Sequence, residues 1–242
     1  MNNIYDDKQF FDQYAKMTRS KKGLEGAVEW NQFKAMFPNL SEKQVLDLGC
    51  GYGWHCKYAL ECGARMVLGI DLSEKMIEEA KVRNPAQQIT YQVCGLEEYE
   101  YPVDSFDCVI SNLVLHYVAD IDMIYKKIHR TLKESGVLLI NIEHPVFTAG
   151  VNQEWIYGED QKPLYWPVDD YFYPGERLTN FLGEKVKKQH HTLTQILMGL
   201  INAGFRIEEV NEAMPIGDIT EKNNMSEEMR RPMMLLIKAV KR

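Results

Sequence analysis

The segment Val45–Gly53, with the sequence VLDLGCGYG, constrains the fold of this chain more than any other. It predicts a buried strand that ends in a glycine-rich turn, and Trp54–Cys62 is expected to follow as a helix. The next strand-like run, Met66–Ile70, ends at Asp71. A strand, a glycine turn, a helix and a second strand tipped by a carboxylate are the parts of a nucleotide site. Glycine lets a ligand approach the backbone closely, because it has no Cβ.

The spacing of the glycines separates the classes of nucleotide site. Asp47 is followed at alternate positions by Gly49, Gly51 and Gly53. This D-x-G-x-G-x-G pattern differs from the G-x-G-x-x-G of dinucleotide enzymes, and Trp54 stands where their third glycine is needed. No G-x-x-x-x-G-K-[ST] occurs, so a phosphate-binding P-loop is disfavoured. The glycine pattern alone also fits a tight turn in some other α/β protein.

Two motifs together, D-L-G-C-G-Y-G at 47–53 and G-I-D-L-S at 69–73, resemble those of the class I S-adenosylmethionine-dependent methyltransferases. The likeness is greatest to the small-molecule branch, the type 11 methyltransferase domain of the ubiquinone, menaquinone and biotin-pathway enzymes. It covers residues 42–141 well and the rest of the chain in outline. The resemblance implies S-adenosylmethionine as cofactor, S-adenosylhomocysteine as product, and a small-molecule methyl acceptor that reacts at oxygen, nitrogen or carbon.

The resemblance also assigns cofactor contacts. Asp71 is expected to clamp the ribose, and a helix-entry carboxylate near Ser73 is the structural alternative. Leu72 and Met76 are expected to flank the adenine, although Met76 also suits the core. Tyr14 on an N-terminal helix is expected to touch the methionine end, or only to pack. The remaining cofactor candidates in the motifs are Asp47, Gly49, Cys50, Gly51, Gly53, Ser111 and Asn112.

One family motif is altered in this chain. Where the family often carries an Asp that bonds the adenine amino group, this chain has Gly95, followed by Leu96 and Glu97. The resemblance then leaves the adenine to backbone groups near Leu96 or to the Glu97 side chain. A plain solvent-facing carboxylate is the alternative for Glu97.

Histidines are the candidates for a general base, which is needed only if the acceptor loses a proton. His116 follows the expected fourth strand, and His144 follows the fifth, both at the edge where open α/β sheets bind ligands. Each also suits a purely structural role. His190 and His191 come later in the chain, and adjacent residues of an extended segment face opposite ways.

Strands alternate with helices, which predicts a single α/β domain with a Rossmann-like, doubly wound, mostly parallel sheet. The family resemblance implies seven strands with the last one antiparallel. The expected strands are Gln44–Leu48, Met66–Ile70, Ile89–Val93, Ser105–Ser111, Val137–Ile142, Phe205–Val210 and Met233–Val240. Residues 1–40 are expected to form a helical cap from Tyr5–Met17 and Gly26–Phe37, residues 42–142 the cofactor-binding core, and residues 192–242 the end of the sheet.

Residues 146–187 show no clean period and are rich in aromatic side chains. An aromatic insertion can bury surface, so it is unlike a disordered linker. We expect it to form a lid over the acceptor pocket. The alternative is a satellite cluster that only covers the edge of the sheet. The aromatic residues expected to line the lid are Trp155, Tyr165, Trp166 and Tyr171.

Composition narrows the partners. The net charge is −7, and no long basic run occurs, which disfavours a nucleic-acid partner. No run of about 18 apolar residues and no signal-peptide core is present. We therefore expect no membrane span and a cytoplasmic location. The five cysteines form no C-x-x-C pair, which argues against a structural zinc site, and no metal is expected.

Two alternative functions are also considered. A nicotinamide-dependent oxidoreductase predicts binding of NADH, but its glycine signature is missing here. A non-catalytic module that senses S-adenosylmethionine predicts cofactor binding without a closed acceptor pocket. The sequence does not indicate the oligomeric state.

Overall fold

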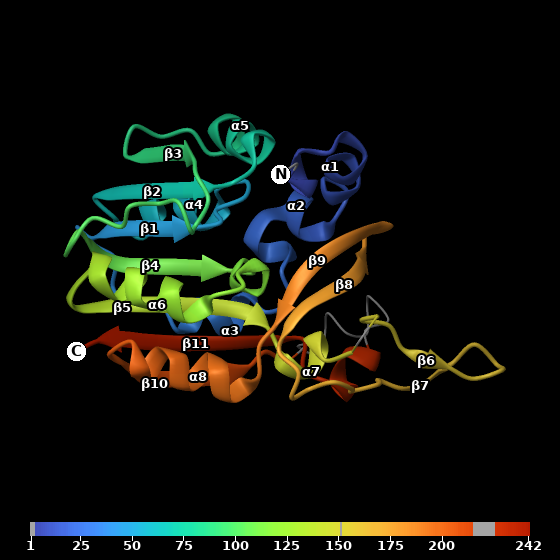
Figure 1. Cartoon of the computed structure of the whole chain (residues 1–242). Helices are drawn as coiled ribbons and strands as arrows, with labels where there is room; N and C mark the ends of the chain where they lie inside the picture. The colour runs from blue at the N-terminus through green and yellow to red at the C-terminus, as the bar shows by residue number, and fades with distance from the viewer. Residues whose placement is uncertain (1–2, 151, 215–225) are drawn as a thin grey trace.

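The computed structural model describes residues 3–150, 152–214 and 226–242. Its main feature is a seven-stranded sheet with the strand order β10-β11-β5-β4-β1-β2-β3. Six strands are parallel to one another, and β11 runs antiparallel to both of its neighbours (Figure 1). The expected seven-stranded sheet with an antiparallel last strand is therefore confirmed. The strands are β1 (Gln44–Leu48), β2 (Met66–Asp71), β3 (Ile89–Val93), β4 (Phe106–Asn112), β5 (Leu132–Glu143), β10 (Phe205–Glu212) and β11 (Met234–Lys241).

The sheet has a hydrophobic core on each face, because side chains along a strand point alternately to opposite sides. In β4, Val109 packs into one core, while Cys108 and Ile110 pack into the other. Two helices cover the first face and three cover the second (Figure 1). The first pair is α6 (Ile121–Thr131) and α8 (Leu193–Asn202), and the other three are α3 (Trp30–Ala35), α4 (Trp54–Glu61) and α5 (Glu74–Arg83).

Side-chain caps set where the longer helices begin. The Ser73 hydroxyl accepts a hydrogen bond from the Met76 amide at 3.1 Å, and α5 starts there. Thr192 and Gln195 form a capping box that starts α8. Such caps satisfy the amides that a first helical turn leaves unpaired. Among the described residues, no helix is both long and apolar enough to span a bilayer.

The N-terminal region differs from the two long helices expected at Tyr5–Met17 and Gly26–Phe37, so that prediction is wrong. The Asp7 carboxylate accepts a hydrogen bond from the Phe10 amide, so the first helix begins only after Asp7. Gly23 adopts a left-handed φ of 64°. A Cβ on Gly26 would lie 2.5 Å from the Thr18 carbonyl oxygen, so the chain turns tightly there. The result is a series of short elements: η1 (Ile4–Asp6), α1 (Lys8–Tyr14), α2 (Thr18–Lys22), η2 (Gly23–Gly26) and α3.

The insertion after β5 is more regular than expected. It begins with α7 (Pro145–Thr148) and continues as two antiparallel hairpins. In Figure 1 the β6–β7 hairpin projects away from the sheet, whereas the β8–β9 hairpin runs towards the N-terminal helices. The hairpins consist of β6 (Ile156–Tyr157), β7 (Pro163–Tyr165), β8 (Gly175–Phe181) and β9 (Glu184–His190).

Residues 215–225, between β10 and β11, lie outside the described residues. The described part that follows forms a short 3-10 helix, η4 (Ser226–Arg230).

Candidate functional site

Three strands end at the same level of the sheet. Leu48 in β1 pairs with Ile70 in β2 and with Ser111 in β4. The loops that follow these strands therefore leave the sheet side by side, at its carboxyl edge. Open α/β sheets bind ligands at this edge. The N-terminal helices and the β8–β9 hairpin lie at the same end of the molecule (Figure 1).

The glycine turn after β1 has left-handed backbone at each of its glycines, where side chains are strained. Their φ values are 68°, 52° and 76° for Gly49, Gly51 and Gly53. A Cβ on Gly49 would lie 2.6 Å from Val114, and one on Gly53 would meet the Tyr91 hydroxyl. A Cβ on Gly51 would meet nothing within 4 Å. Two of the glycines thus allow close packing, and Gly51 leaves a stretch of backbone open to a ligand.

Asp71 at the tip of β2 is fixed by two amides. The Gly51 and Ser73 N–H groups each donate a hydrogen bond of 2.9 Å, to different oxygens of its carboxylate. A carboxylate has about four acceptor positions, so about two remain for a diol. Burial raises the pKa of Asp71 to about 6, although these two hydrogen bonds lower it. The carboxylate is therefore ionised at neutral pH.

Asp47 and Cys50 lie beneath the glycine turn. Asp47 is buried in β1, where its carboxylate accepts a hydrogen bond from the Cys56 thiol at 3.2 Å. Burial raises the pKa of Asp47 to about 7. The Cys50 amide donates to the Ile70 carbonyl at 2.9 Å, and its thiol lies above Gly69. These side chains support the turn from below.

Beyond Asp71 lies a surface with both apolar and acidic character. Leu72 is 57% exposed and lies close to Gly95, where a Cβ would be 3.4 Å from Leu72 Cδ1. The same Cβ would touch the Glu98 carboxylate, so Glu98 covers Gly95. The Glu97 side chain is exposed, and its carbonyl accepts a hydrogen bond from Lys127 at 2.5 Å. Leu96 is buried in the first core.

Met76 is 2% exposed within α5, so its side chain belongs to the interior. Ser111 is also fully buried, and its hydroxyl meets no hydrogen-bonding group among the described residues. The Asn112 amide oxygen accepts from Asn141 at 2.9 Å, and Asn141 also donates to Glu29 at 3.1 Å. This network joins the ends of β4 and β5 to the residue before α3.

A belt of four tyrosines, which we call the tyrosine belt, runs across the carboxyl edge. Tyr52 in the glycine turn packs edge-on against Tyr14 at 5.7 Å between ring centroids. Tyr14 packs against Tyr5 at 5.5 Å, and the Tyr5 and Tyr117 hydroxyls are 2.9 Å apart. Tyr14 thus lies between the glycine turn and the region after β4.

His116 lies next to the tyrosine belt. It is in η3 (Leu115–Tyr117), and its ring centroid is 4.5 Å from that of Tyr117. His116 is buried, and its Nδ1 has no hydrogen-bonding partner in the described part of the chain. Its Nε2 lies 3.9 Å from the Glu143 carboxylate. Burial lowers the pKa of His116 to about 4, so the ring is neutral near neutral pH.

His144 has a different environment. Its Nδ1 accepts a hydrogen bond from the Val146 amide at 3.1 Å, as the cap of α7. Its Nε2 lies 2.9 Å from the Glu212 carboxylate. Both ring nitrogens thus face protein groups. His190 and His191 are likewise engaged, with Thr148 and Tyr171 and with the Val118 carbonyl.

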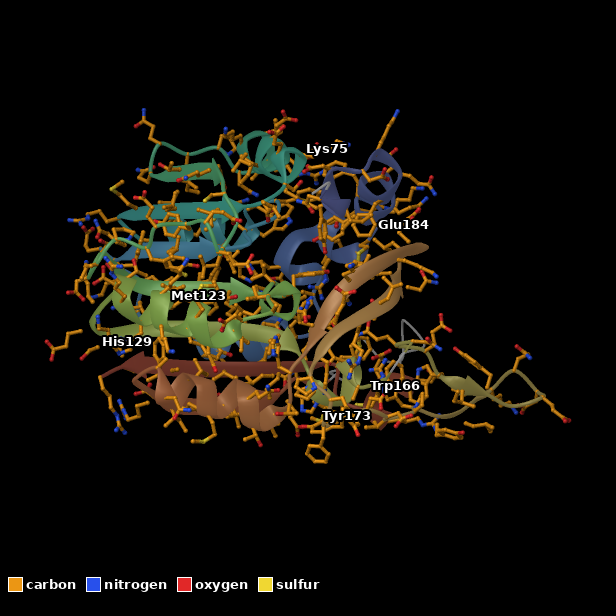
Figure 2. The ribbon with its side chains drawn as sticks, viewed as in Figure 1. Lys75, Met123, His129, Trp166, Tyr173 and Glu184 are labelled. Carbon is orange, nitrogen blue, oxygen red and sulfur yellow. The ribbon has the colours of Figure 1, made fainter. Side chains whose placement is uncertain are left out.

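The aromatic insertion divides into two parts. Trp166 stacks on Phe147 at 5.1 Å, packs edge-on against Trp155 at 5.4 Å, and lies 4.2 Å from the Arg231 guanidinium. Figure 2 shows Trp166 at the other end of the β8–β9 hairpin from Glu184. Tyr165 is 57% exposed. These contacts match the satellite cluster rather than pocket walls.

The part of the insertion that reaches the tyrosine belt is the β8–β9 hairpin. Phe181 near its tip packs against Phe10 at 5.8 Å, and Phe10 packs against Tyr5 at 5.0 Å. Tyr171, which precedes the hairpin, accepts a hydrogen bond from the Leu193 amide at 3.1 Å. The four aromatic residues predicted to line a lid therefore do not gather in one place, since Trp155 and Trp166 pack together whereas Tyr171 contacts His190.

Sequence reasoning missed three residues of this region: Glu98, Glu143 and Lys188. Lys188 is buried and pairs with Glu143, although lysine is rarely buried. One signal was present in the sequence. Val186, Lys188 and His190 alternate along one face of β9, and all three are buried.

These features fit a nucleoside cofactor. The open backbone at Gly51, the acceptor positions left on Asp71 and the apolar Leu72 suit a ribose and an adenine. Nicotinamide dinucleotides need a helix N-terminus free for pyrophosphate. Here α4 begins with the bulky Trp54 directly after the turn.

Comparisons with known proteins agree with this geometry. A family model described as a methyltransferase domain matches residues 46–140. An uncharacterised protein of Haemophilus influenzae is 32% identical over 251 residues, which is 100% of this chain and 99% of that protein. A solved structure from Listeria monocytogenes, provisionally assigned as an S-adenosylmethionine-dependent methyltransferase, is 46% identical with a TM-score of 0.87 and covers 91% of this chain and 99% of its own.

A second solved structure, an S-adenosylmethionine-dependent methyltransferase from Mesorhizobium loti, is 40% identical with a TM-score of 0.84. It covers 90% of this chain and 100% of its own length. The likeness thus extends well beyond the glycine motif to nearly the whole fold. The chain belongs to the class I S-adenosylmethionine-dependent methyltransferases of the small-molecule branch, and S-adenosylmethionine is its cofactor.

Proposed function

We propose that this enzyme methylates a small-molecule acceptor bound between the glycine turn, the tyrosine belt and the β8–β9 hairpin. The observation that carries the proposal is the Asp71 carboxylate, held by two amides beside the open backbone of Gly51. It supports a cofactor site on one side of the edge. His116 and the hairpin, on the other side of the belt, support an acceptor site there.

Each residue has a proposed task. Asp71 accepts hydrogen bonds from the ribose hydroxyls, and Leu72 packs on the adenine. Glu98, which covers Gly95, takes the role of the acidic adenine contact in place of Glu97. Tyr14 borders the methionine end, because it packs between Tyr52 and Tyr5.

Of the two histidines predicted as bases, His116 is the better candidate, because the Nε2 of His144 lies 2.9 Å from the Glu212 carboxylate. When bound, S-adenosylmethionine supplies an activated methyl group on a sulfonium centre. The enzyme aligns the acceptor and excludes water, and alignment is the larger contribution. His116 is neutral and its Nδ1 is unpaired, so it is better suited than His144 to take a proton from the acceptor.

Calorimetric titration with S-adenosylhomocysteine tests the cofactor side. Hydrogen bonds to a charged group contribute about 1.5–3 kcal/mol, so Asp71→Asn should raise the Kd about tenfold to a hundredfold. Asp104→Asn is the control, because the Asp104 side chain is 60% exposed on the surface. Equal Kd values for the two variants would remove Asp71 from the site, and tighter binding of NADH than of S-adenosylhomocysteine would favour the oxidoreductase.

A pair of glycine variants tests the approach to the backbone. Gly51 and Gly183 both have positive φ, and a Cβ at either would meet nothing within 4 Å. Gly51→Ala and Gly183→Ala therefore add similar backbone strain without a clash inside the protein. Only Gly51→Ala should abolish cofactor binding, and retained affinity would contradict the loop assignment.

Release of S-adenosylhomocysteine with a panel of small hydroxyl, amine and carboxyl compounds tests the acceptor side. Turnover with small molecules supports the proposal. Turnover only with protein or nucleic acid would contradict it.

A further inference from the structure

A buried polar cluster joins three parts of the chain beside the tyrosine belt. Lys188 Nζ lies 2.5 Å from Glu143 Oε1, and His116 Nε2 lies 3.9 Å from the same oxygen. Gln153 completes the cluster: it donates to Glu143 Oε2 at 3.1 Å and accepts from Lys188 at 3.2 Å. His116 comes from η3, Glu143 from the end of β5 and Lys188 from β9.

The cluster is a specific arrangement, because a buried charge pair is costly unless its geometry and remaining hydrogen bonds are good. The Lys188 side chain is 4% exposed and that of Glu143 is 13% exposed. Both carboxylate oxygens of Glu143 are engaged, by Lys188 and by Gln153. A simpler way to attach a hairpin to a sheet is an apolar contact of the same size.

The pKa of His116 is shifted by burial and by three neighbouring groups. Burial lowers its pKa, Glu143 raises it, and Lys188 and His191 lower it. Burial also raises the pKa of Glu143, but His116, Lys188 and Gln153 lower it, and the pKa lies below its ordinary value. At neutral pH the cluster therefore holds a neutral imidazole beside a carboxylate that is paired with Lys188.

The carboxylate lies on the Nε2 side of the imidazole, and Nδ1 has no partner in the described ranges. A carboxylate beside one ring nitrogen favours the proton on that nitrogen and leaves the other as the base, as in nucleophile–base–carboxylate sites. His116 also contacts Tyr117, which the tyrosine belt connects to the glycine turn. The His116 ring thus lies beside the Tyr117 end of the belt, with a buried Nδ1 that has no partner among the described residues.

We propose that Glu143 and Lys188 are positioning residues that hold His116 as its Nε2–H tautomer, with Nδ1 ready to accept a proton from the methyl acceptor. This inference rests on the proposed function. It also narrows the acceptor to a group with a hydrogen to lose, such as a hydroxyl. The acceptor lone pair forms the new bond to the methyl carbon, the old carbon–sulfur pair stays on sulfur, and the acceptor proton passes to Nδ1.

A carboxylate acceptor fits this cluster poorly. It has no proton to lose, so it needs no base. It would instead gain from a free cation, and Lys188, the lysine of this cluster, is already paired with Glu143 at 2.5 Å. Lys188 therefore acts on the histidine through Glu143 rather than on the substrate.

The tautomer is measurable without any substrate. Protein labelled with ¹⁵N at histidine gives long-range ¹H–¹⁵N correlations that show which ring nitrogen carries the proton, and the His116→Gln variant assigns the signal. At neutral pH, His116 should be protonated at Nε2 only. If His116 of the unmodified enzyme is protonated at Nδ1, or is an even mixture of tautomers, the proposal is overturned, whatever the lysine variants below show.

Two lysine variants then separate positioning from simple attachment. Lys188→Met should convert the single tautomer of His116 into a mixture, whereas Lys188→Arg should restore it. Lys187→Met is the matched control, because Lys187 is the next residue, with a 70% exposed side chain paired to Glu176. An unchanged His116 signal in folded Lys188→Met would show that Lys188 only fastens the hairpin. S-adenosylhomocysteine should still bind Lys188→Met. If the unmodified enzyme itself failed to bind S-adenosylhomocysteine, that result would count against the proposed function and not against the positioning role of Lys188.

Discussion

At the scale of single residues, Asp71 couples cofactor affinity to pH. Its pKa is about 6 because burial outweighs the hydrogen bonds from Ser73 and Gly51. Ligand hydroxyls need the ionised form, so affinity should be full above about pH 6 and fall by up to about tenfold per pH unit below it.

Calorimetry with S-adenosylhomocysteine from about pH 5 to pH 8 measures this dependence. Asp71→Asn should bind weakly and lose the dependence. If the variant keeps the dependence, the titrating group is another one, and Asp47, with a pKa of about 7, is the next candidate.

Two adjacent carboxylates give a second residue-scale prediction. Both side chains are exposed, but the Glu98 carboxylate lies against Gly95. Glu98→Gln should therefore weaken S-adenosylhomocysteine about threefold to tenfold, since an exposed charged hydrogen bond contributes about 1 kcal/mol. Glu97→Gln should leave the Kd unchanged. A larger rise of the Kd in Glu97→Gln than in Glu98→Gln would instead support Glu97 as the adenine contact, as predicted from the sequence.

The sequence predicted the glycine turn after β1 and the carboxylate at the end of β2, because these residues are close together in the chain. It did not predict Glu98, because the choice between neighbours depends on a turn in which the Tyr99 amide bonds the Gly95 carbonyl at 3.0 Å. It did not predict Lys188 either. That lysine lies 45 residues from Glu143, and only the tertiary fold brings the two together.

At the scale of elements, the β8–β9 hairpin has an unusual turn. Leu182 and Gly183, its two central residues, both have positive φ, of 55° and 87°. Hairpins favour such turns, but normally with Asn or Asp at the first position. The hairpin was missed in the sequence for this reason, and because β9 is rich in charged residues that conceal a period of two.

The turn can be improved. Leucine in the left-handed region costs roughly 1–2 kcal/mol, and Asn tolerates that region better. Leu182→Asn should therefore raise the free energy of unfolding by about 1 kcal/mol in urea denaturation. A lower stability would mean that the Leu182 side chain contributes packing that outweighs its backbone strain.

Regular elements of the sheet were easier to predict. β1 and β3 have the expected bounds, because short apolar runs between turn residues mark them. The N-terminal helices were predicted too long, since the tight turn at Gly23 and Gly26 depends on contacts with Thr18 and Trp54. Such contacts become visible only when the chain is folded.

At the scale of the whole molecule, Phe10 connects the N-terminal elements to the insertion. It is fully buried and packs between Tyr5 and Phe181. Phe10→Ala should lower the free energy of unfolding by about 3–5 kcal/mol, the usual cost for a buried phenylalanine. Circular dichroism and tryptophan fluorescence should report one shared transition.

Phe172→Ala is the control, because Phe172 is 84% exposed, and it should change stability by less than about 0.5 kcal/mol. Two separate transitions, or an unchanged stability in Phe10→Ala, would show that the N-terminal elements fold independently of the insertion.

The position of β11 bears on how this protein is made. β11 lies between β5 and β10, yet Met234 is synthesised about 90 residues after Glu143. While the ribosome adds those residues, the edge of β5 has no strand to pair with, and unpaired edges invite association with other chains. Nascent chains stalled before Met234 should therefore be digested readily by protease and should bind chaperones. Once β11 has left the ribosome, both the protease sensitivity and the chaperone binding should be lost.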